Sequence, residues 1–274
     1  MSRFGPLVGA GWLAAHLETV VVVDFRWYLD GRSGRAAYDA AHIPGAVFLD
    51  LEAVTGTGGA GRHPLPAGDV FEARMREAGL NRNSDVVVYD DTGGLTAGRL
   101  WFLLRYFGHD RVAVLDGGLG GWTQPLSTEP VRPPAGDFTA SEPHLEMVLD
   151  HEAVRSLPAT SRVLDARASE RYRGDVEPID PRAGHIPGAV SAPWEANLDS
   201  ERRFLEPAAL RARFAALGAA GGPDSVAYCG SGVSACANLL ALELAGLGGG
   251  RLYAGSWSDW SSRPEAPVAT GPDP

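Results

Sequence analysis

Short runs of apolar residues alternate along this chain with longer segments that have the apolar character of buried helices. The apolar runs lie within residues 20–23, 85–89, 112–115, 163–164, 224–228 and 251–253. The most apolar helices are expected over residues 98–107 and 236–244. Strands that are apolar on both faces and alternate with helices are typical of a parallel sheet covered by helices on both sides. The pattern therefore predicts an α/β protein.

One hexapeptide occurs twice. The sequence HIPGAV stands at residues 42–47 and again at residues 185–190. In each half it follows an apolar strand that closes on an aspartate and an arginine, and in the second half these are Asp165 and Arg167. We expect each such pair to tie neighbouring loops together. Six identical residues in the same order indicate a duplicated domain, because the repeat period is too long for a solenoid.

A proline-rich segment separates the two halves. It reads EPVRPPAGD at residues 129–137 and favours neither a helix nor an inner strand. We therefore predict a first α/β domain over residues 1–135, a linker over residues 136–145 and a second α/β domain over residues 146–274.

The most informative stretch is SVAYCGSGVSA at residues 225–235. An apolar strand ends at Cys229, two glycines follow within three residues, and an apolar helix comes next. Backbone N–H groups of such a loop have no partner within the helix, so they can stabilise negative charge on a thiol. The thiolate is the nucleophilic form, and Cys229 is therefore a candidate nucleophile. The alternative is a small buried apolar residue, which is the role expected for Cys236 in the helix.

The first half has lost this cysteine. Aligning Tyr89 with Tyr228 places Asp90 opposite Cys229. The loop at residues 90–95 is acidic, and we expect it to repel an anion rather than bind one. One half would then catalyse while the other shapes the site, and the alternative is that the first half is only a scaffold.

Composition narrows the class of protein further. The net charge of −10 argues against nucleic acid or an anionic membrane surface as the main partner. No apolar run approaches the length of a membrane span. Two cysteines close in sequence do not suggest a disulfide, so we expect a reducing cytoplasm. No Cys/His cluster has zinc spacing, and no metal site is predicted.

Taken together, these motifs resemble the tandem-domain rhodanese family of sulfurtransferases. The resemblance covers nearly the whole chain and includes GSWSDW at residues 255–260. It implies two tandem rhodanese-like domains, the first of them inactive. It also implies transfer of a sulfane sulfur through a cysteine persulfide to a thiophilic acceptor, without a metal or an organic cofactor.

The loop sequence separates two activities within that family. Thiosulfate-type members carry bulky basic residues after the cysteine, whereas mercaptopyruvate-type members read CGSGVTA. This chain reads CGSGVSA at residues 229–235, with Ser234 in place of threonine. The resemblance therefore implies 3-mercaptopyruvate as the donor, with thiosulfate as the alternative. The acceptor would be a small thiol or a protein thiol such as thioredoxin, or cyanide in an assay.

The resemblance also assigns roles to individual residues. A serine–histidine–acid relay maps onto Ser231, His63 and Glu52. The family usually has aspartate at the acid position, so Asp50 is the alternative. Histidine suits this role because it exchanges a proton near neutral pH.

Arginine suits the carboxylate of the donor because its planar guanidinium binds both carboxylate oxygens. Arg171 matches the first substrate arginine of the family, and Arg182 is the nearest candidate for the second, although its spacing is shifted. The remaining donor contacts are expected from the loop itself, at Gly230, Gly232, Val233, Ser234 and Ala235.

Three other classes of protein compete with this interpretation. Residues 230–235 also fit the dinucleotide fingerprint, but no acidic residue follows at the spacing of a ribose partner, and too little chain remains for another βαβ unit. A cysteine phosphatase needs an arginine in this loop, and none is present. A non-catalytic binding module would not need Cys229.

Overall fold

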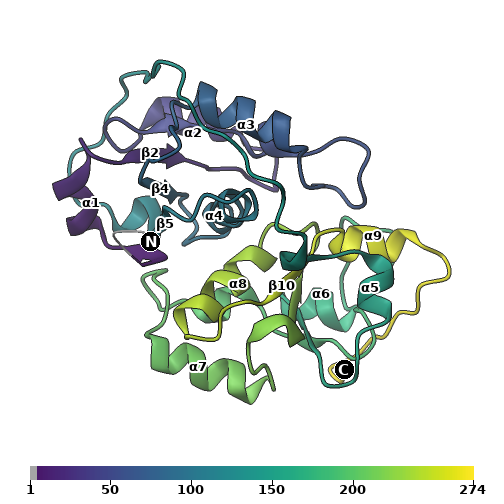
Figure 1. Ribbon diagram of the computed structural model, residues 1–274. Coiled ribbons are helices and arrows are strands. Elements are labelled where there is room, and N and C mark those ends of the chain that lie inside the picture. Colours follow the sequence, from purple (N-terminus) through teal and green to yellow (C-terminus); the bar gives the residue numbers. More distant parts are fainter. Residues whose placement is uncertain (1–4) are drawn as a thin grey trace. The chain divides into compact units, whose positions relative to one another are not determined.

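The computed structural model describes residues 5–274, which form two compact units. The first four residues, part of the predicted first domain, lie outside the described residues. Each unit contains one five-stranded sheet in which all paired strands are parallel, and helices flank each sheet (Figure 1). The predicted fold class is confirmed. Within residues 5–274, no helix is both long enough and apolar enough to cross a membrane.

The sheet of the first unit has the strand order β1-β5-β4-β2-β3. Its strands are β1 (Leu7–Val8), β2 (Val21–Asp24), β3 (Val47–Phe48), β4 (Val86–Tyr89) and β5 (Val112–Leu115). Its helices are α1 (Ala10–His16), α2 (Gly34–Ala40), α3 (Gly68–Glu77) and α4 (Ala97–Tyr106), with 3-10 turns η1 (Leu51–Val54) and η2 (Gly118–Gly121).

The second unit repeats this order as β6-β10-β9-β7-β8. Its strands are β6 (Val148–Leu149), β7 (Arg162–Asp165), β8 (Val190–Ser191), β9 (Ser225–Tyr228) and β10 (Arg251–Tyr253). Its helices are α5 (His151–Arg155), α6 (Ser169–Arg173), α7 (Pro207–Ala216), α8 (Ala235–Leu244) and α9 (Ser256–Ser262), with 3-10 turns η3 (Leu145–Met147), η4 (Trp194–Asn197) and η5 (Gly222–Asp224).

The middle strand of each sheet explains the apolar runs in the sequence. All four residues of β4 and all four of β9 are buried. A central parallel strand covered by helices has no solvent face, so it shows continuous apolar residues rather than alternation. The same constraint leaves the carboxyl end of the strand as the place where a polar or reactive side chain can stand.

The repeated hexapeptide is a structural motif. In the second unit the His185 ring stacks on Tyr172 with centroids 3.8 Å apart, and its Nδ1 lies 2.8 Å from the Tyr172 carbonyl oxygen. The next residue, Ile186, donates its N–H to the Tyr228 hydroxyl at 3.2 Å. His42 makes the same stacking contact in the first unit, at 3.9 Å from Tyr38. The motif therefore anchors the connection into each sheet and does not carry chemistry.

The segment predicted as a linker is part of the first unit. Residues 136–144 lie on that unit and add backbone hydrogen bonds to it, from Phe138 to Leu80 at 3.1 Å and from Ser141 to Phe107 at 3.0 Å. Phe138 is almost fully buried. The prolines mark where regular structure stops, but the apolar ring of Phe138 decides that the segment packs. In this part of the chain the first unit ends at residue 144 and the second begins at residue 145.

Two short segments belong to the unit of the opposite half. Residues 56–65, called arm 56–65 below, form part of the second unit, and residues 199–204, called arm 199–204, form part of the first. In arm 199–204 the Phe204 N–H donates to Asp116 at 2.9 Å, and Arg202 Nε donates to the Thr92 carbonyl at 3.0 Å. A cut at a single residue therefore does not describe how the chain divides.

The loop after β4 contains its own anion. The Asp90 carboxylate accepts hydrogen bonds from the backbone N–H groups of Thr92, Gly94, Thr96 and Ala97 at 2.9–3.0 Å. The expectation that this acidic loop repels an anion therefore needs a refinement, because the loop cradles an anion supplied by its own side chain. Loop N–H groups of this kind bind negative charge wherever it comes from.

Replacing Asp90 with alanine is expected to destabilise the first unit by about 2–4 kcal/mol, because buried N–H donors lose a charged acceptor. Urea unfolding followed by circular dichroism measures the change. Asp91→Ala is the matched control, since Asp91 is exposed and its carboxylate accepts the Tyr28 hydroxyl rather than a set of buried N–H groups. Equal losses in the two variants would contradict this role of Asp90.

Candidate active site

Cys229 follows directly after β9 and is 2% exposed. The Gly232 N–H donates to its Sγ at 3.1 Å. Gly232 has a φ of +79°, a conformation that favours glycine, and this turn brings its N–H back toward the sulfur. Helix α8 begins three residues further on, at Ala235. Strand, loop and helix therefore lie in the predicted order, with the thiol at the start of the loop.

Helix α9 holds the first two peptide groups of this loop. The Trp257 and Ser258 N–H groups donate to the carbonyls of Cys229 and Gly230, both at 2.9 Å. The Cys229 N–H in turn donates to the Ser256 hydroxyl at 3.1 Å. The sequence GSWSDW therefore fixes the direction of the loop backbone, because the N-terminal N–H groups of α9 need acceptors outside the helix.

Arm 56–65 brings His63 to the loop. The His63 Nδ1 lies 2.7 Å from the Ser231 hydroxyl oxygen, and both side chains are buried. The Arg62 N–H donates to Ser258 Oγ at 3.1 Å, which attaches the arm to α9. Gly61 has a φ of +81°, and a Cβ there would clash with the Gly255 carbonyl, so only glycine allows this close approach.

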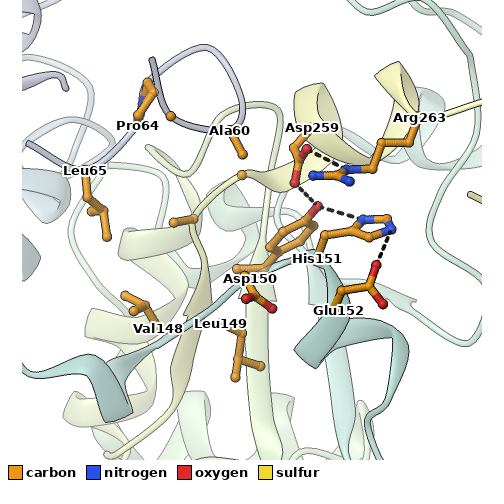
Figure 2. A pocket seen from close by; sticks show the side chains of 14 residues that line it. Ala60, Pro64, Leu65, Val148, Leu149, Asp150, His151, Glu152, Asp259 and Arg263 are labelled. Carbon is orange, nitrogen blue, oxygen red and sulfur yellow. Dashed lines mark hydrogen bonds and ion pairs between the residues drawn. The ribbon is translucent and has the colours of Figure 1, made fainter. Parts of the chain in front are cut away.

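A cavity of about 350 Å³ lies behind the arm. Figure 2 shows Ala60 and Pro64 of the arm on one side of it and Asp259 on another. The Asp259 carboxylate accepts the Tyr253 hydroxyl at 2.7 Å and Arg263 Nε at 2.8 Å. Cys229 is not among the lining residues, and the cavity is therefore distinct from the reactive loop.

Two arginines lie beside Gly230, the residue that follows Cys229. A Cβ added to Gly230 would come within 2.8 Å of Arg62 Nη2 and 3.5 Å of Arg171 Nη1. Arg171 donates to Glu177 at 2.6 Å and to Asp180 at 3.2 Å, and Arg62 forms an ion pair with Asp180. Arg171 was predicted as a site residue, whereas Arg62 was not. The only signal for Arg62 in the sequence is its position next to His63.

Arg182 makes a different set of contacts. Its guanidinium donates to four carbonyl oxygens, at 2.6–2.9 Å, in the segment that follows α9 and at the end of that helix. These acceptors are the carbonyls of Trp260, Ser261, Arg263 and Ala266. The guanidinium is committed to anchoring the C-terminal segment. Arg182 as a substrate residue stays a prediction that this geometry does not favour.

The predicted acid of the relay lies in the first unit. Glu52 is exposed in the turn η1, and the Asp50 side chain caps that turn by accepting the Glu52 N–H at 3.1 Å. His63 belongs to the second unit. The choice between Glu52 and Asp50 as its acidic partner stays a prediction.

The remaining loop residues build the start of α8. The Val233 and Ser234 carbonyls accept the N–H groups of Cys236 and Ala237, both at 3.1 Å. Val233 and Ala235 are buried, and Ser234 is half-buried. The Cys236 thiol is fully buried and donates to the Gly232 carbonyl at 3.3 Å, in agreement with a packing role. Within residues 5–274, no group of three or more His, Cys, Asp or Glu side chains has the geometry to hold a metal ion.

This geometry defines a class of two-unit α/β proteins with a cysteine-bearing loop in one unit only. Residues 9–125 and 150–263 each match the model of the rhodanese-like domain. The chain therefore belongs to the rhodanese-like domain family and carries that domain twice.

Named relatives agree with this assignment. The chain is 46% identical to a protein of Pseudomonas aeruginosa named probable 3-mercaptopyruvate sulfurtransferase, over 97% of this chain and 98% of the relative. It is 40% identical to a Mycobacterium tuberculosis protein named putative thiosulfate sulfurtransferase SseB, over 97% of both. The crystal structure of the 3-mercaptopyruvate sulfotransferase SseA from Escherichia coli matches with a TM-score of 0.82 and 35% identity, over 93% of this chain and 100% of that chain.

The chain is a sulfurtransferase, with a sulfur donor and a sulfur acceptor as its substrates. The resemblance to tandem-domain rhodaneses is confirmed, and the dinucleotide-binding, phosphatase and non-catalytic interpretations give way to it.

If Cys229 carries the sulfur, Cys229→Ser abolishes sulfur transfer and Cys236→Ser retains most of it. Serine at position 236 can keep the hydrogen bond to the Gly232 carbonyl, so this variant is a matched control. Intact-mass spectrometry after treatment with a sulfur donor should show a gain of one sulfur atom in the wild type and in Cys236→Ser only. If Cys236→Ser lost this gain and Cys229→Ser kept it, Cys236 rather than Cys229 would be the nucleophile.

Proposed function

We propose that this sulfurtransferase takes sulfur from 3-mercaptopyruvate and passes it through a persulfide on Cys229 to a thiol acceptor. The contact of 2.7 Å between His63 Nδ1 and Ser231 Oγ, two residues after Cys229, carries this proposal. A proton path beside the nucleophile is useful to a donor whose leaving group needs a proton. The name of the P. aeruginosa relative points in the same direction.

The first half-reaction transfers one sulfur atom to the protein. The Cys229 thiolate attacks the thiol sulfur of the donor, a sulfur–sulfur bond forms, and the bond from that sulfur to C3 breaks. The electron pair leaves on C3 as the enolate of pyruvate. The proton of the donor thiol reaches C3 by way of Ser231 and His63, which yields pyruvate and a persulfide anion on Cys229.

The loop stabilises that anion. The Gly232 N–H already donates to Cys229 Sγ at 3.1 Å, and donors of this kind act most strongly in a site closed to water. In the second half-reaction an acceptor thiolate attacks the outer sulfur and takes it away, which restores the Cys229 thiolate. The two steps give double-displacement kinetics.

Arg171 and Arg62 are the proposed partners of the donor carboxylate. Both guanidiniums lie beside Gly230, the residue that follows the nucleophile. The Arg171 Nε–H is buried and has no hydrogen-bond partner within residues 5–274, so a donor bond remains for a ligand. Glu52 completes the relay in this proposal, with Asp50 as the alternative.

The loop residues predicted to contact the donor remain part of the proposal. They are Gly230, Gly232, Val233, Ser234 and Ala235. Thioredoxin or another protein thiol is the proposed acceptor, and the cytoplasm is the proposed location, because both cysteines are free thiols and persulfide chemistry needs reduced thiols.

Thiosulfate is the second candidate donor, favoured by the name of the M. tuberculosis relative. Its leaving group, sulfite, departs as a stable anion that needs no proton. The two donors therefore differ in whether they need proton transfer by Ser231 and His63. A comparison of kcat/KM for both donors in the wild-type protein tests the assignment directly.

Arg171→Ala is expected to raise the KM for 3-mercaptopyruvate by about one to two orders of magnitude, since a hydrogen bond to a charged group contributes roughly 1.5–3 kcal/mol. Discharge of the persulfide to an acceptor should change far less. Arg173→Ala is the matched control, because Arg173 lies on the same helix and pairs with the exposed Asp175. An unchanged KM with a collapsed kcat would place Arg171 in the chemical step instead.

His63→Ala and Ser231→Ala are each expected to slow 3-mercaptopyruvate turnover by about 100-fold or more, the usual contribution of a positioned acid or base. The double variant should be little slower than either single variant, because residues that act as a unit are not additive. Thiosulfate turnover should respond only weakly to His63→Ala. Equal losses for the two donors would show that His63 only braces the loop.

A further inference from the structure

Six charged side chains of the second unit form a continuous chain of alternating sign. In order they are Asp165, Arg167, Glu177, Arg171, Asp180 and Arg62. The N···O distances between the first five successive members are 2.6 Å, 3.3 Å, 2.6 Å and 3.2 Å, and an ion pair between Asp180 and Arg62 closes the series. This series of ion pairs starts at the buried carboxyl end of β7 and ends beside the loop that begins at Cys229.

The side chains of Glu177 and Asp180 are almost completely buried. The Glu177 and Asp180 side chains are each 3% exposed, whereas Arg171 is 15% and Arg62 is 30% exposed. Burial raises the pKa of Asp180 although Arg62 and Arg171 oppose the shift. Burial therefore disfavours the charge of Asp180, and the ion pairs with Arg62 and Arg171 offset part of that cost.

Asp180 differs from Glu177 in what it contacts. Glu177 connects Arg171 to the structural pair of Arg167 and Asp165. Asp180 instead bridges Arg62 and Arg171, the two guanidiniums that lie beside Gly230. With Glu177 it brings the charge of these two arginines close to zero. A dianionic ligand experiences twice the effect of this neutralisation that a monoanion does, because Coulomb energy is proportional to the product of charges.

We infer that Asp180 sets the donor selectivity of the loop that begins at Cys229. Its negative charge beside Arg62 and Arg171 favours a monoanionic carboxylate donor over a dianionic donor such as thiosulfate. This inference rests on the proposed function for the identity of the preferred donor. Asp180 acts through the two arginines and is a positioning residue. Its effect falls on binding, so KM for a dianion responds and kcat does not.

The decisive variant is Asp180→Asn, which removes the charge and keeps an amide oxygen that can accept from Arg62. The ratio of kcat/KM for thiosulfate to that for 3-mercaptopyruvate should rise by about tenfold or more, mainly through the KM for thiosulfate. Asp180→Glu retains the charge and should retain the wild-type ratio. Asp175→Asn is the matched control, since it makes the same change in net charge at an exposed pair with Arg173.

A binding measurement separates this inference from the proposed function. Inert sulfate and pyruvate protect Cys229 from alkylation by iodoacetamide, and peptide mapping of the alkylated residue gives an apparent Kd for each. In Asp180→Asn the Kd for sulfate should fall about tenfold or more relative to that for pyruvate. This result would support the selectivity role even if 3-mercaptopyruvate proved not to be the donor, an outcome that the wild-type kinetics would reveal.

Arg62→Gln is expected to change the affinity for sulfate relative to pyruvate in the opposite direction. Loss of one cation should weaken sulfate more than pyruvate, and it serves as the test if Asp180→Asn does not fold. Circular dichroism and a thermal melt establish which variants are folded. A sulfate-to-pyruvate ratio that stays at the wild-type value in the folded charge variants would overturn the inference.

Discussion

The burial of Arg167 at the carboxyl end of β7 constrains the whole second unit. Its guanidinium is 2% exposed and needs carboxylates, because an unpaired buried charge costs several kcal/mol. Asp165, on the strand itself, and Glu177, in the segment after α6, both form ion pairs with Arg167. Glu177 then orients Arg171, and from there Asp180 reaches Arg62. Neutralisation of one arginine thereby orders the segment between α6 and β8 and positions arm 56–65 against the loop.

The two units diverged from one framework by placing different groups in the same loop. Both present a loop whose N–H groups converge at the end of a central strand. In the first unit these groups bind the carboxylate of Asp90, and in the second unit one of them donates to the sulfur of Cys229. A helix or turn after the next strand clamps the same carbonyl in each case, since Leu119 donates to Asp90 at 2.7 Å and Trp257 donates to Cys229 at 2.9 Å. A filled cradle is inert, whereas a cradle around a thiol is suited to hold a persulfide.

The arginines beside Gly230 could be predicted from the sequence only in part. Arg171 was assigned from the resemblance to the family and lies beside Gly230. Arg182 was chosen for its nearness to the HIPGAV motif, yet its donors are taken by the carbonyls around the end of α9. Arg62, more than 100 positions earlier than Arg171, lies beside Gly230 instead. Spacing along one segment cannot reveal a cation that comes from another segment.

The sequence by itself determined the α/β class, the duplication and the strand–loop–helix around Cys229, and its resemblance to a known family assigned Ser231 and His63 as a pair. The first three are local patterns or a repeated motif, and local patterns follow from backbone geometry and from the burial of apolar strands. Only the tertiary structure decided that arm 56–65 joins the second unit, that Asp180 couples Arg62 to Arg171, and that residues 136–144 pack on the first unit. These features depend on how buried charges and aromatic rings are satisfied across distant segments, and that requirement has no period or spacing in the chain.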